Sequence, residues 1–413
     1  MSMLNSNNKN ATMLVIVAAL GYFVDVFDLL LFGMVRIGSL RDLGVPEADL
    51  ESVGMHLDNL QMIGMLLGGL IWGIIGDKKG RLSVLFGSIL TYSIANFLNA
   101  HINSVEQYAV LRLIAGFGLA GELGAGITLI NETLSKEKRG LAAAFVAGFG
   151  VLGAVFGALL VLEIGDWRMC YMIGGGMGVA LLILRISVFE SGMYQNVKHK
   201  TSQLGDLRLL FGNKKNLKKY LAIIFIAVPI WYVVQLYSKY APELAEALGL
   251  HVENKKEVAV YAIMAIYTGL TFGDVACGFY SNWVKSRKKA IITYLSFLVG
   301  LIVIFWFVAK ISFAVFYGMI FLMGLGIGYW AVFVTTASEA FGTNIRSTVS
   351  NTVPNFVRGF VVIINFMYIS FKDMTSSTIT ANILTGIICV GLALYAWTQL
   401  EETYGKDLDY VEE

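Results

Sequence analysis

The sequence predicts an all-α integral membrane protein whose twelve transmembrane helices form two six-helix pseudo-repeats. Composition is the first reason, because hydrophobic residues make up 57% of the 413 residues and charged residues only 15%. Soluble domains carry about 25% charged residues. The second reason is that apolar runs recur at the length of about 20 residues that a helix needs to cross a bilayer. The third reason is that the two halves of the chain repeat spaced motifs.

The apolar segments set the predicted boundaries. They fall at residues 11–35, 58–76, 82–100, 106–130, 141–163, 168–188, 220–238, 258–281, 288–309, 311–336, 350–371 and 377–399. The first run is too long for a signal-peptide core, so we interpret it as an uncleaved first span. We predict an N-terminal six-helix bundle at 1–188, a cytoplasmic linker at 189–219, a C-terminal six-helix bundle at 220–400 and a cytoplasmic tail at 401–413.

The distribution of basic residues predicts the orientation in the membrane. Once the spans are drawn, most of the 31 Lys and Arg residues, Arg185 among them, fall on the side that holds the N-terminus, and fewer, including Arg36 and Lys239, fall on the other side. Short cytoplasmic loops carry such an excess of Lys and Arg. We therefore expect both termini to be cytoplasmic, in a protein of the cell inner (plasma) membrane.

The two halves share motifs at matched offsets. Gly73 opens GIIGDKKGR, and Gly278 opens GFYSNWVKSRKK 205 residues later. Glu132 and Arg139 recur as Glu339 and Arg346, each shifted by 207 residues. The agreement of these offsets indicates a duplication, and paired repeats around a central site are typical of secondary transporters.

The stretch GYFVDVFDLLLF, residues 21–32, places two aspartates inside an apolar run. Asp25 and Asp28 share a helix face near the bilayer middle, where one charge costs about 2.5–3.5 kcal/mol. Two neighbouring carboxylates cannot both be ionised cheaply there. Either one of them holds a proton or a cation lies nearby. A role in proton coupling or substrate contact competes with that of a structural pair neutralised by another helix.

Two arginines and a glutamate also lie inside spans. Arginine keeps its charge, so Arg112 needs a carboxylate or an anionic ligand. We expect Asp25 or Asp28 to be its partner if the first and fourth helices face each other. Glu122, on the same helix, is a second candidate for proton coupling or else a structural hydrogen-bond partner. Arg358 is a candidate clamp for a substrate carboxylate, unless its side chain extends to the cytoplasmic surface. Pro354, four residues before it, is expected to kink that helix.

Polar and aromatic residues of the later spans complete the predicted binding site. Aromatic residues in spans more often pack or form interfacial belts, but Tyr329 and Trp330 lie mid-span after a glycine ladder, which favours a cavity wall. The predicted substrate-binding residues are Arg112, Tyr232, Gln235, Tyr329, Trp330, Asn355 and Arg358.

The segment GIIGDKKGR resembles the loop motif between the second and third helices of the major facilitator superfamily, with Gly73, Asp77, Gly80 and Arg81 at the matching positions. The resemblance implies the major facilitator fold and alternating access. The predicted gating-loop residues are Gly73, Asp77, Gly80, Arg81, Glu132, Arg139, Glu339 and Arg346.

Within that superfamily, residues 12–195 are similar to the metabolite–proton symporter group, which includes proline/betaine, citrate, oxoglutarate and shikimate porters. The matching residues are Gly21, Asp25, Asp28 and Gly33 in the first helix, and Arg112, Gly116, Gly118, Gly121 and Glu122 in the fourth. Two departures leave the substrate open. The group usually has Glu at the position of Asp25, and Asn282 stands where the first half has Asp77.

These observations predict a secondary active transporter, not an enzyme, for proton-coupled symport of a small polar metabolite such as an organic acid, an amino acid or a betaine. A proton-driven exporter and a transporter-like sensor that no longer transports are the alternatives. We expect no cofactor, with the proton as coupling ion and sodium left open. The cysteines and histidines show no metal-site or redox spacing. The expected partners are a small-molecule substrate and membrane lipid, without nucleic acid, and we expect a monomer.

Overall fold

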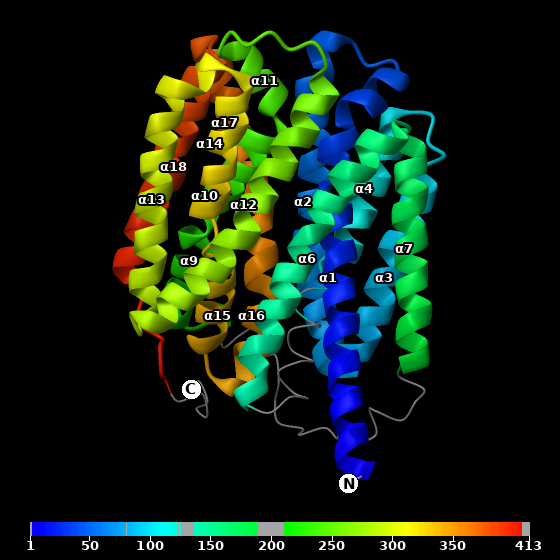
Figure 1. Ribbon diagram of the computed structural model, residues 1–413, viewed down its shortest axis with the longest axis vertical. Helices are drawn as coiled ribbons and strands as arrows, with labels where there is room; N and C mark the ends of the chain where they lie inside the picture. The colour runs from blue at the N-terminus through cyan, green and yellow to red at the C-terminus, as the bar shows by residue number, and fades with distance from the viewer. Residues whose placement is uncertain (1, 80, 123, 125–135, 189–209, 407–413) are drawn as a thin grey trace.

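The computed structural model describes residues 2–79, 81–122, 124, 136–188 and 210–406. Its helices stand side by side in one long bundle, with the start of α1 and the segment after α18 at the same end (Figure 1). In the first half they are α1 (Ser2–Asp42), α2 (Leu50–Lys79), α3 (Arg81–Asn99), α4 (Val105–Leu119), α6 (Lys136–Ile164) and α7 (Trp167–Val188).

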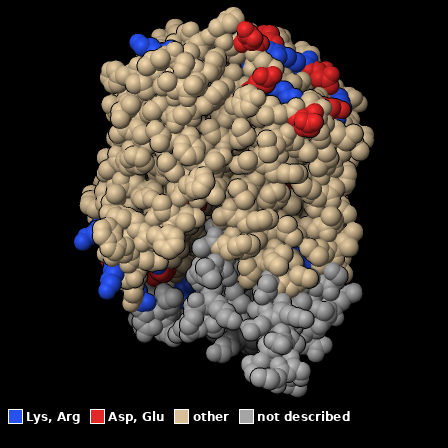
Figure 2. Space-filling view, in the orientation of Figure 1, with Lys and Arg blue, Asp and Glu red and all other residues tan. Residues whose placement is uncertain are grey.

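The second half contains more and shorter pieces. They are α9 (Lys214–Ile226), α10 (Val228–Val233), α11 (Ala241–Ala247), α12 (Lys255–Trp283), α13 (Arg287–Val308), α14 (Phe313–Gly326), α15 (Trp330–Glu339), α16 (Thr343–Gly359), α17 (Val361–Thr375) and α18 (Thr378–Gln399). Within the described ranges, 9 helical segments are long and apolar enough to cross a membrane. Figure 2 shows charged side chains gathered towards the ends of the molecule, with a broad, nearly uncharged band between them. The predicted all-helical membrane fold is confirmed.

Several helices begin at a polar cap in the turn that precedes them. Ser104, Asn254, Ser286, Ser312 and Ser377 each accept a hydrogen bond from an amide in the first turn of the following helix. Such caps satisfy amide groups that have no partner inside the helix. The polar turns therefore fix where these helices start.

Glycines let two helix pairs approach to backbone contact. A Cβ on Gly324 of α14 would lie 2.2 Å from the carbonyl oxygen of Ile266 on α12, and one on Gly269 would lie 2.1 Å from that of Phe321. On α2, a Cβ at Gly64 would lie 2.1 Å from the carbonyl oxygen of Leu113 on α4. Small residues allow this closeness in membrane helices, and it gives each half a rigid helix pair.

Three spans of the second half are interrupted where the sequence predicts continuous helices. The predicted span 220–238 contains α9, α10 and a π-helical turn, Val234–Lys239. The span 311–336 is split between Gly326 and Trp330, and the span 350–371 is split at Phe360. The eleventh helix therefore runs through Pro354 and is interrupted six residues later. Irregular backbone at membrane depth is tolerated only where protein or a cavity surrounds it.

The two halves meet mainly along α1, α2 and α6 of the first half and α12 and α16 of the second. Helix α1 packs against α12 across this interface, α2 packs against α16, and α6 packs against α12. The interruptions at Phe360 and before Trp330 lie on the side of the second half that supplies this interface. The packing therefore brings the charged residues of α1 opposite those of α16.

Candidate functional site

A small closed cavity lies between the halves, at the level of the interrupted helices. Its wall includes Tyr22 of α1, Trp231 of α10, Tyr267 of α12, Trp330 at the start of α15 and Arg358 of α16. Its volume of about 20 Å³ suffices for about one water molecule. The cavity thus combines one cation with aromatic side chains from both halves.

Asp25 and Arg358 form an ion pair across the interface at this cavity. Arg358 Nη2 lies 3.7 Å from Asp25 Oδ2, and the two side chains are 2% and 0% exposed. Among the described residues, neither oxygen of Asp25 and neither Nε nor Nη1 of Arg358 has a hydrogen-bond partner. Arg358 also lies 5.9 Å from the ring centroids of Trp231 and Trp330. The arginine faces the cavity and does not extend to the surface, and its free N–H groups can receive a ligand.

Asp28 lies one turn further along α1 and forms no ion pair with a described residue. Both of its oxygens lack a hydrogen-bond partner among the described residues, and the side chain is 3% exposed. Its polar neighbour Asn96 lies with it against Gly174 of α7. The expected pair with Arg112 is not formed, because Arg112 donates to Gln61 Oε1 and, at 3.4 Å, to the hydroxyl of Tyr171.

Glu122 is held inside the first half by Arg185 of α7. Both guanidinium Nη groups donate to the carboxylate, with Nη1 3.1 Å from Oε2. Both side chains are buried. A side chain at Gly21 of α1 would overlap this pair, so the glycine makes room for it. The sequence prediction missed Arg185 because it counted this residue among the cytoplasmic anchors.

The end of the molecule opposite the termini is closed by polar contacts between the halves. Nη2 of Arg36 on α1 lies 2.6 Å from Oε1 of Glu243 on α11. Asp58 of α2 accepts from Lys239 Nζ at 3.0 Å and from Gln235 Nε2 at 3.1 Å, both in the π-helical turn. A third contact joins Glu51 to Lys372. We call these three ion pairs the outer lock; its members are Arg36, Glu51, Asp58, Lys239, Glu243 and Lys372.

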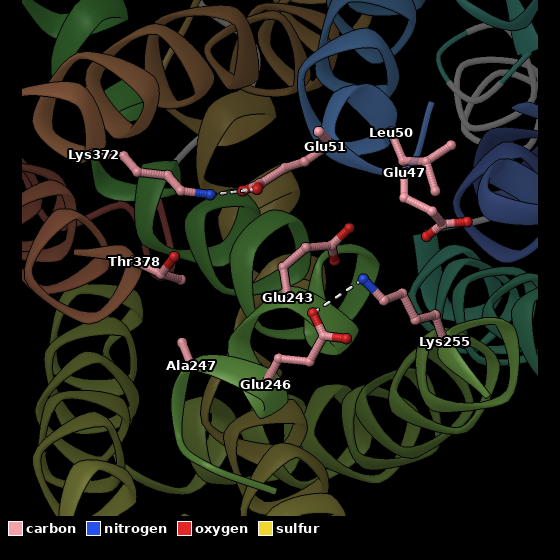
Figure 3. Close-up of a pocket in the computed structure, with 10 residues that line it drawn as sticks. Glu47, Leu50, Glu51, Glu243, Glu246, Ala247, Lys255, Lys372 and Thr378 are labelled. Carbon is pink, nitrogen blue, oxygen red and sulfur yellow. Dashed lines mark hydrogen bonds and ion pairs between the residues drawn. The ribbon is translucent and has the colours of Figure 1, made fainter. Parts of the chain in front are cut away.

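A pocket of about 300 Å³ lies beside the outer lock. Figure 3 shows carboxylates from both halves and two lysines of the second half around it, with Lys372 paired to Glu51 and Lys255 paired to Glu246. The Lys255–Glu246 distance is 3.0 Å. The pocket is therefore a polar vestibule whose described carboxylates lie among cations.

The predicted substrate-binding residues separate into two groups. Trp330 and Arg358 line the central cavity. The others donate hydrogen bonds to neighbouring helices. Tyr232 donates to Asn382 Oδ1 at 2.6 Å, and Tyr329 donates to the Ile226 carbonyl at 3.0 Å. Asn355 donates to the Ala120 carbonyl at 2.9 Å, Gln235 donates to Asp58, and Arg112 donates to Gln61. The prediction omitted the cavity residues Tyr22, Trp231 and Tyr267, since isolated aromatics in apolar runs give no distinguishing signal.

The predicted gating residues are described in part. Glu339 pairs with Arg287 at 3.2 Å, and Arg346 Nε donates to the Ser338 carbonyl at 2.9 Å. A Cβ at Gly73 would meet nothing within 4 Å. Gly80 and Glu132 lie outside the described residues, and so do the side chains of Asp77, Arg81 and Arg139.

Comparisons with known proteins bear on the family. A model of the Major Facilitator Superfamily matches residues 17–371. A Bacillus subtilis (strain 168) protein named for niacin and nicotinamide transport is 23% identical over 391 residues, which cover 92% of each chain. The proline/betaine transporter of Escherichia coli (strain K12) is 24% identical over 366 residues, covering 80% of this chain and 71% of the other. The structure of a proton:xylose symporter bound to 6-bromo-6-deoxy-D-glucose superposes with a TM-score of 0.72 at 17% identity, covering 98% of both chains.

The family match covers most of the chain, and the solved structure shares its helical fold from end to end. The resemblance predicted from the loop motif and from the first and fourth helices is confirmed, and the relatives include a member of the predicted symporter group. The chain belongs to the Major Facilitator Superfamily and is a multi-pass membrane transporter of small molecules, not an enzyme.

Proposed function

We propose that the protein takes up a small carboxylate or zwitterion together with a proton, by alternating access of two bundles at residues 1–188 and 220–400. The bundles are joined by the linker 189–219, both termini are cytoplasmic, and the protein acts as a monomer in the inner membrane. The single observation that carries the proposal is the Asp25–Arg358 pair, which joins the halves at the wall of a central cavity.

The substrate carboxylate binds Arg358 in this proposal. Arginine holds a carboxylate through two parallel N–H donors, and two of its nitrogens lack a protein partner among the described residues. Trp231 and Trp330 flank the guanidinium, so a flat ring or a methylated cation attached to the carboxylate would contact aromatic faces. Niacin, for which one relative is named, has a flat ring, and betaine, for which another is named, has a methylated cation.

The two aspartates take different roles. A substrate carboxylate competes with Asp25 for Arg358, so its arrival releases one half from the other. Asp28 forms no ion pair with a described residue, and a buried carboxylate without one is far less costly when it is protonated. Asp28 therefore carries the proton, while Asp25 releases Arg358 when the substrate carboxylate binds.

The cycle requires the closed cavity to open. A volume of about 20 Å³ holds no organic molecule, and the outer lock covers the path to the end opposite the termini. The described conformation is the one in which this outer path is shut. Substrate entry from outside therefore requires the ion pairs of the outer lock to separate.

A thermal-shift screen with a matched ligand pair tests this function. Nicotinate and nicotinamide have the same ring, but only nicotinate is a carboxylate; proline and glycine betaine extend the panel. A ligand at 100 times its Kd stabilises the folded protein by about 2.7 kcal/mol. We expect at least one carboxylate to raise the melting temperature and Arg358→Ala to remove that shift. If no carboxylate binds, or if Arg358→Ala binds as well as the parent, the proposal fails.

A further inference from the structure

We propose that the first half encloses a hydrated proton route, separate from the substrate cavity, that leads from Asp28 past the Tyr92 hydroxyl to the Glu122–Arg185 pair. The inference rests on the proposed symport and gives it a path. It assigns water as the ligand of a polar cluster inside the bundle, and it assigns Tyr92 as the relay.

The cluster begins with the buried polar face of α3. Tyr92, Ser93, Asn96 and Asn99 are all at most 2% exposed. The Tyr92 hydroxyl, Ser93 Oγ, Asn96 Nδ2 and both terminal atoms of Asn99 lack a hydrogen-bond partner among the described residues. Residues 92, 96 and 99 share one helix face. Buried polar groups are nearly always hydrogen-bonded, and water serves where no protein group is near.

Glycines of α7 let the polar side chains of this cluster lie directly against the α7 backbone. A Cβ on Gly174 would lie 2.8 Å from Asp28 Oδ1 and 3.5 Å from Asn96 Nδ2. A Cβ on Gly178, one turn on, would lie 2.0 Å from Ser93 Oγ. The α7 backbone therefore forms a wall without side chains, against which the polar atoms of α1 and α3 project.

Tyr92 connects Asp28 with Glu122. The Tyr92 ring lies near Gly178 of α7. A Cβ on Gly118 of α4 would lie 2.9 Å from the Cβ of Tyr92. Tyr92 interacts electrostatically with Asp28, Glu122 and Arg185. A hydroxyl both donates and accepts hydrogen bonds, so it can hand on a proton between waters on either side. Asp28 loses one proton and becomes a carboxylate, and Glu122 gains that proton and becomes a carboxylic acid.

Electrostatics gives the route its direction. On the outer side of Asp28, Arg112 donates to the neutral groups of Gln61 and Tyr171, so its positive charge repels a hydronium ion. On the inner side, the charge of Arg185 is cancelled by Glu122. The charged or titratable groups that face Asp28 are thus Asp25 on α1, Tyr92 on α3, Arg112 on α4 and Tyr171 on α7. A proton released from Asp28 therefore moves inward.

The route and the substrate cavity share only α1. The cavity wall contains Tyr22, Val26 and Leu29 of α1 together with residues of α6 and of the second half, and none of α3, α4 or α7. Asp28 faces α7 instead. A proton can therefore leave while the substrate still occupies the cavity.

Radiolytic hydroxyl-radical labelling of the purified parent protein tests the hydration directly, because buried side chains are oxidised when water is bound beside them. We expect Tyr92 to be oxidised several-fold faster than Tyr220, an equally buried tyrosine of the second half whose hydroxyl donates to Thr352 Oγ1 at 2.8 Å. Protection of Tyr92 to the level of Tyr220 overturns the hydrated route whether or not the protein is a symporter.

Tyr92→Phe and Tyr220→Phe test the relay with [¹⁴C]nicotinate as the probe. We expect Tyr92→Phe to slow pH-gradient-driven uptake in proteoliposomes about tenfold, equivalent to about 1.4 kcal/mol on the barrier, with nicotinate counterflow unchanged. Tyr220→Phe keeps both rates. Uptake by Tyr92→Phe at the parent rate overturns the relay. A parent protein that exchanges nicotinate but shows no response to the pH gradient contradicts the proposed symport instead, and the labelling result still decides whether the route is hydrated.

Discussion

At the scale of single residues, the buried acids differ in what faces them. Three of them face a cation at close range: Asp25 faces Arg358, Glu122 faces Arg185, and Asp58 faces Lys239. Asp28 alone among these four has neither an ion pair nor a hydrogen bond within the described part of the chain. It is therefore the one whose charge can change without breaking an existing contact.

Asp28→Asn separates coupling from binding. Asparagine has the same size and cannot titrate, so we expect counterflow of the carboxylate selected by the thermal-shift screen to persist. Accumulation against its gradient should disappear, because no proton is carried. Asp28→Glu restores a titratable group and is expected to recover part of the accumulation. Accumulation by Asp28→Asn at the level of the parent would show that the proton binds elsewhere.

The sequence was sufficient to find these residues but not to pair them. Asp25, Asp28, Arg112 and Arg358 stand out because a charge in an apolar run is costly. Their partners depend on which helices meet and how each is rotated, which hydropathy does not encode. Arg112 was accordingly assigned an aspartate that it does not contact.

Residues at span ends were misjudged for a related reason. Arg36 and Lys239 were counted as loop charges because the apolar windows end before them, whereas α1 continues to Asp42 and the π-helical turn continues to Lys239. Helices in the structure extend beyond their apolar segments, so charges beside a span can be buried between the bundles.

At the scale of elements, close helix pairs give a test that needs no ligand. Gly324→Ala places a methyl group against the backbone of α12, and overpacking of this kind costs about 1–3 kcal/mol. Gly318, on the same helix, has open space at its Cβ position, so Gly318→Ala is the matched control. We expect the melting temperature in detergent to fall for Gly324→Ala only. Equal melting temperatures for the two variants would contradict the packing of α12 on α14.

The interrupted helices show which features of a span the apolar pattern of the sequence can predict. The apolar length of each span is readable, but the breaks at Ala227 and Phe360 are not. Pro229 follows Ala227 in the first turn of α10 and Gly359 precedes Phe360, but Pro354 lies within the continuous helix α16, so glycine and proline alone do not distinguish a break from a continuous helix. These breaks depend on contacts between elements that are distant in the chain.

At the scale of the whole molecule, we expect the ion pairs of the outer lock to stabilise the closed state. Glu243→Gln removes the charge that holds Arg36 across the interface. Glu246→Gln is the control, because Glu246 lies on the same helix but pairs with Lys255 of its own half. Spin labels at Ser52→Cys and Glu253→Cys report the separation of the outer ends, since the native cysteines described are all buried. We expect the fraction of molecules with a longer distance between the two spin labels to increase in Glu243→Gln and not in Glu246→Gln.

An unchanged distance distribution in Glu243→Gln, or equal shifts in the two variants, would show that the pair does not hold the halves together. In the expected case the lock and the Asp25–Arg358 pair act in series. Separation of the outer pairs lets the substrate reach the site from the end opposite the termini, and the bound carboxylate then displaces Asp25 from Arg358. Both steps use contacts between the halves, as alternating access requires.

The central claim is that carboxylate binding and proton binding are coupled, and proton uptake on binding measures this most directly. The purified protein is mixed with the screened carboxylate in weakly buffered detergent solution near neutral pH, and a pH indicator reports the protons taken up. Linkage between the two sites predicts uptake of up to about one proton per bound carboxylate, and Asp28→Asn should bind the ligand without it. The ordinary pKa values of carboxylates and of lysines lie outside the range from about pH 5 to pH 9. Carboxylate binding by the parent protein without proton uptake at any pH in this range would contradict the account.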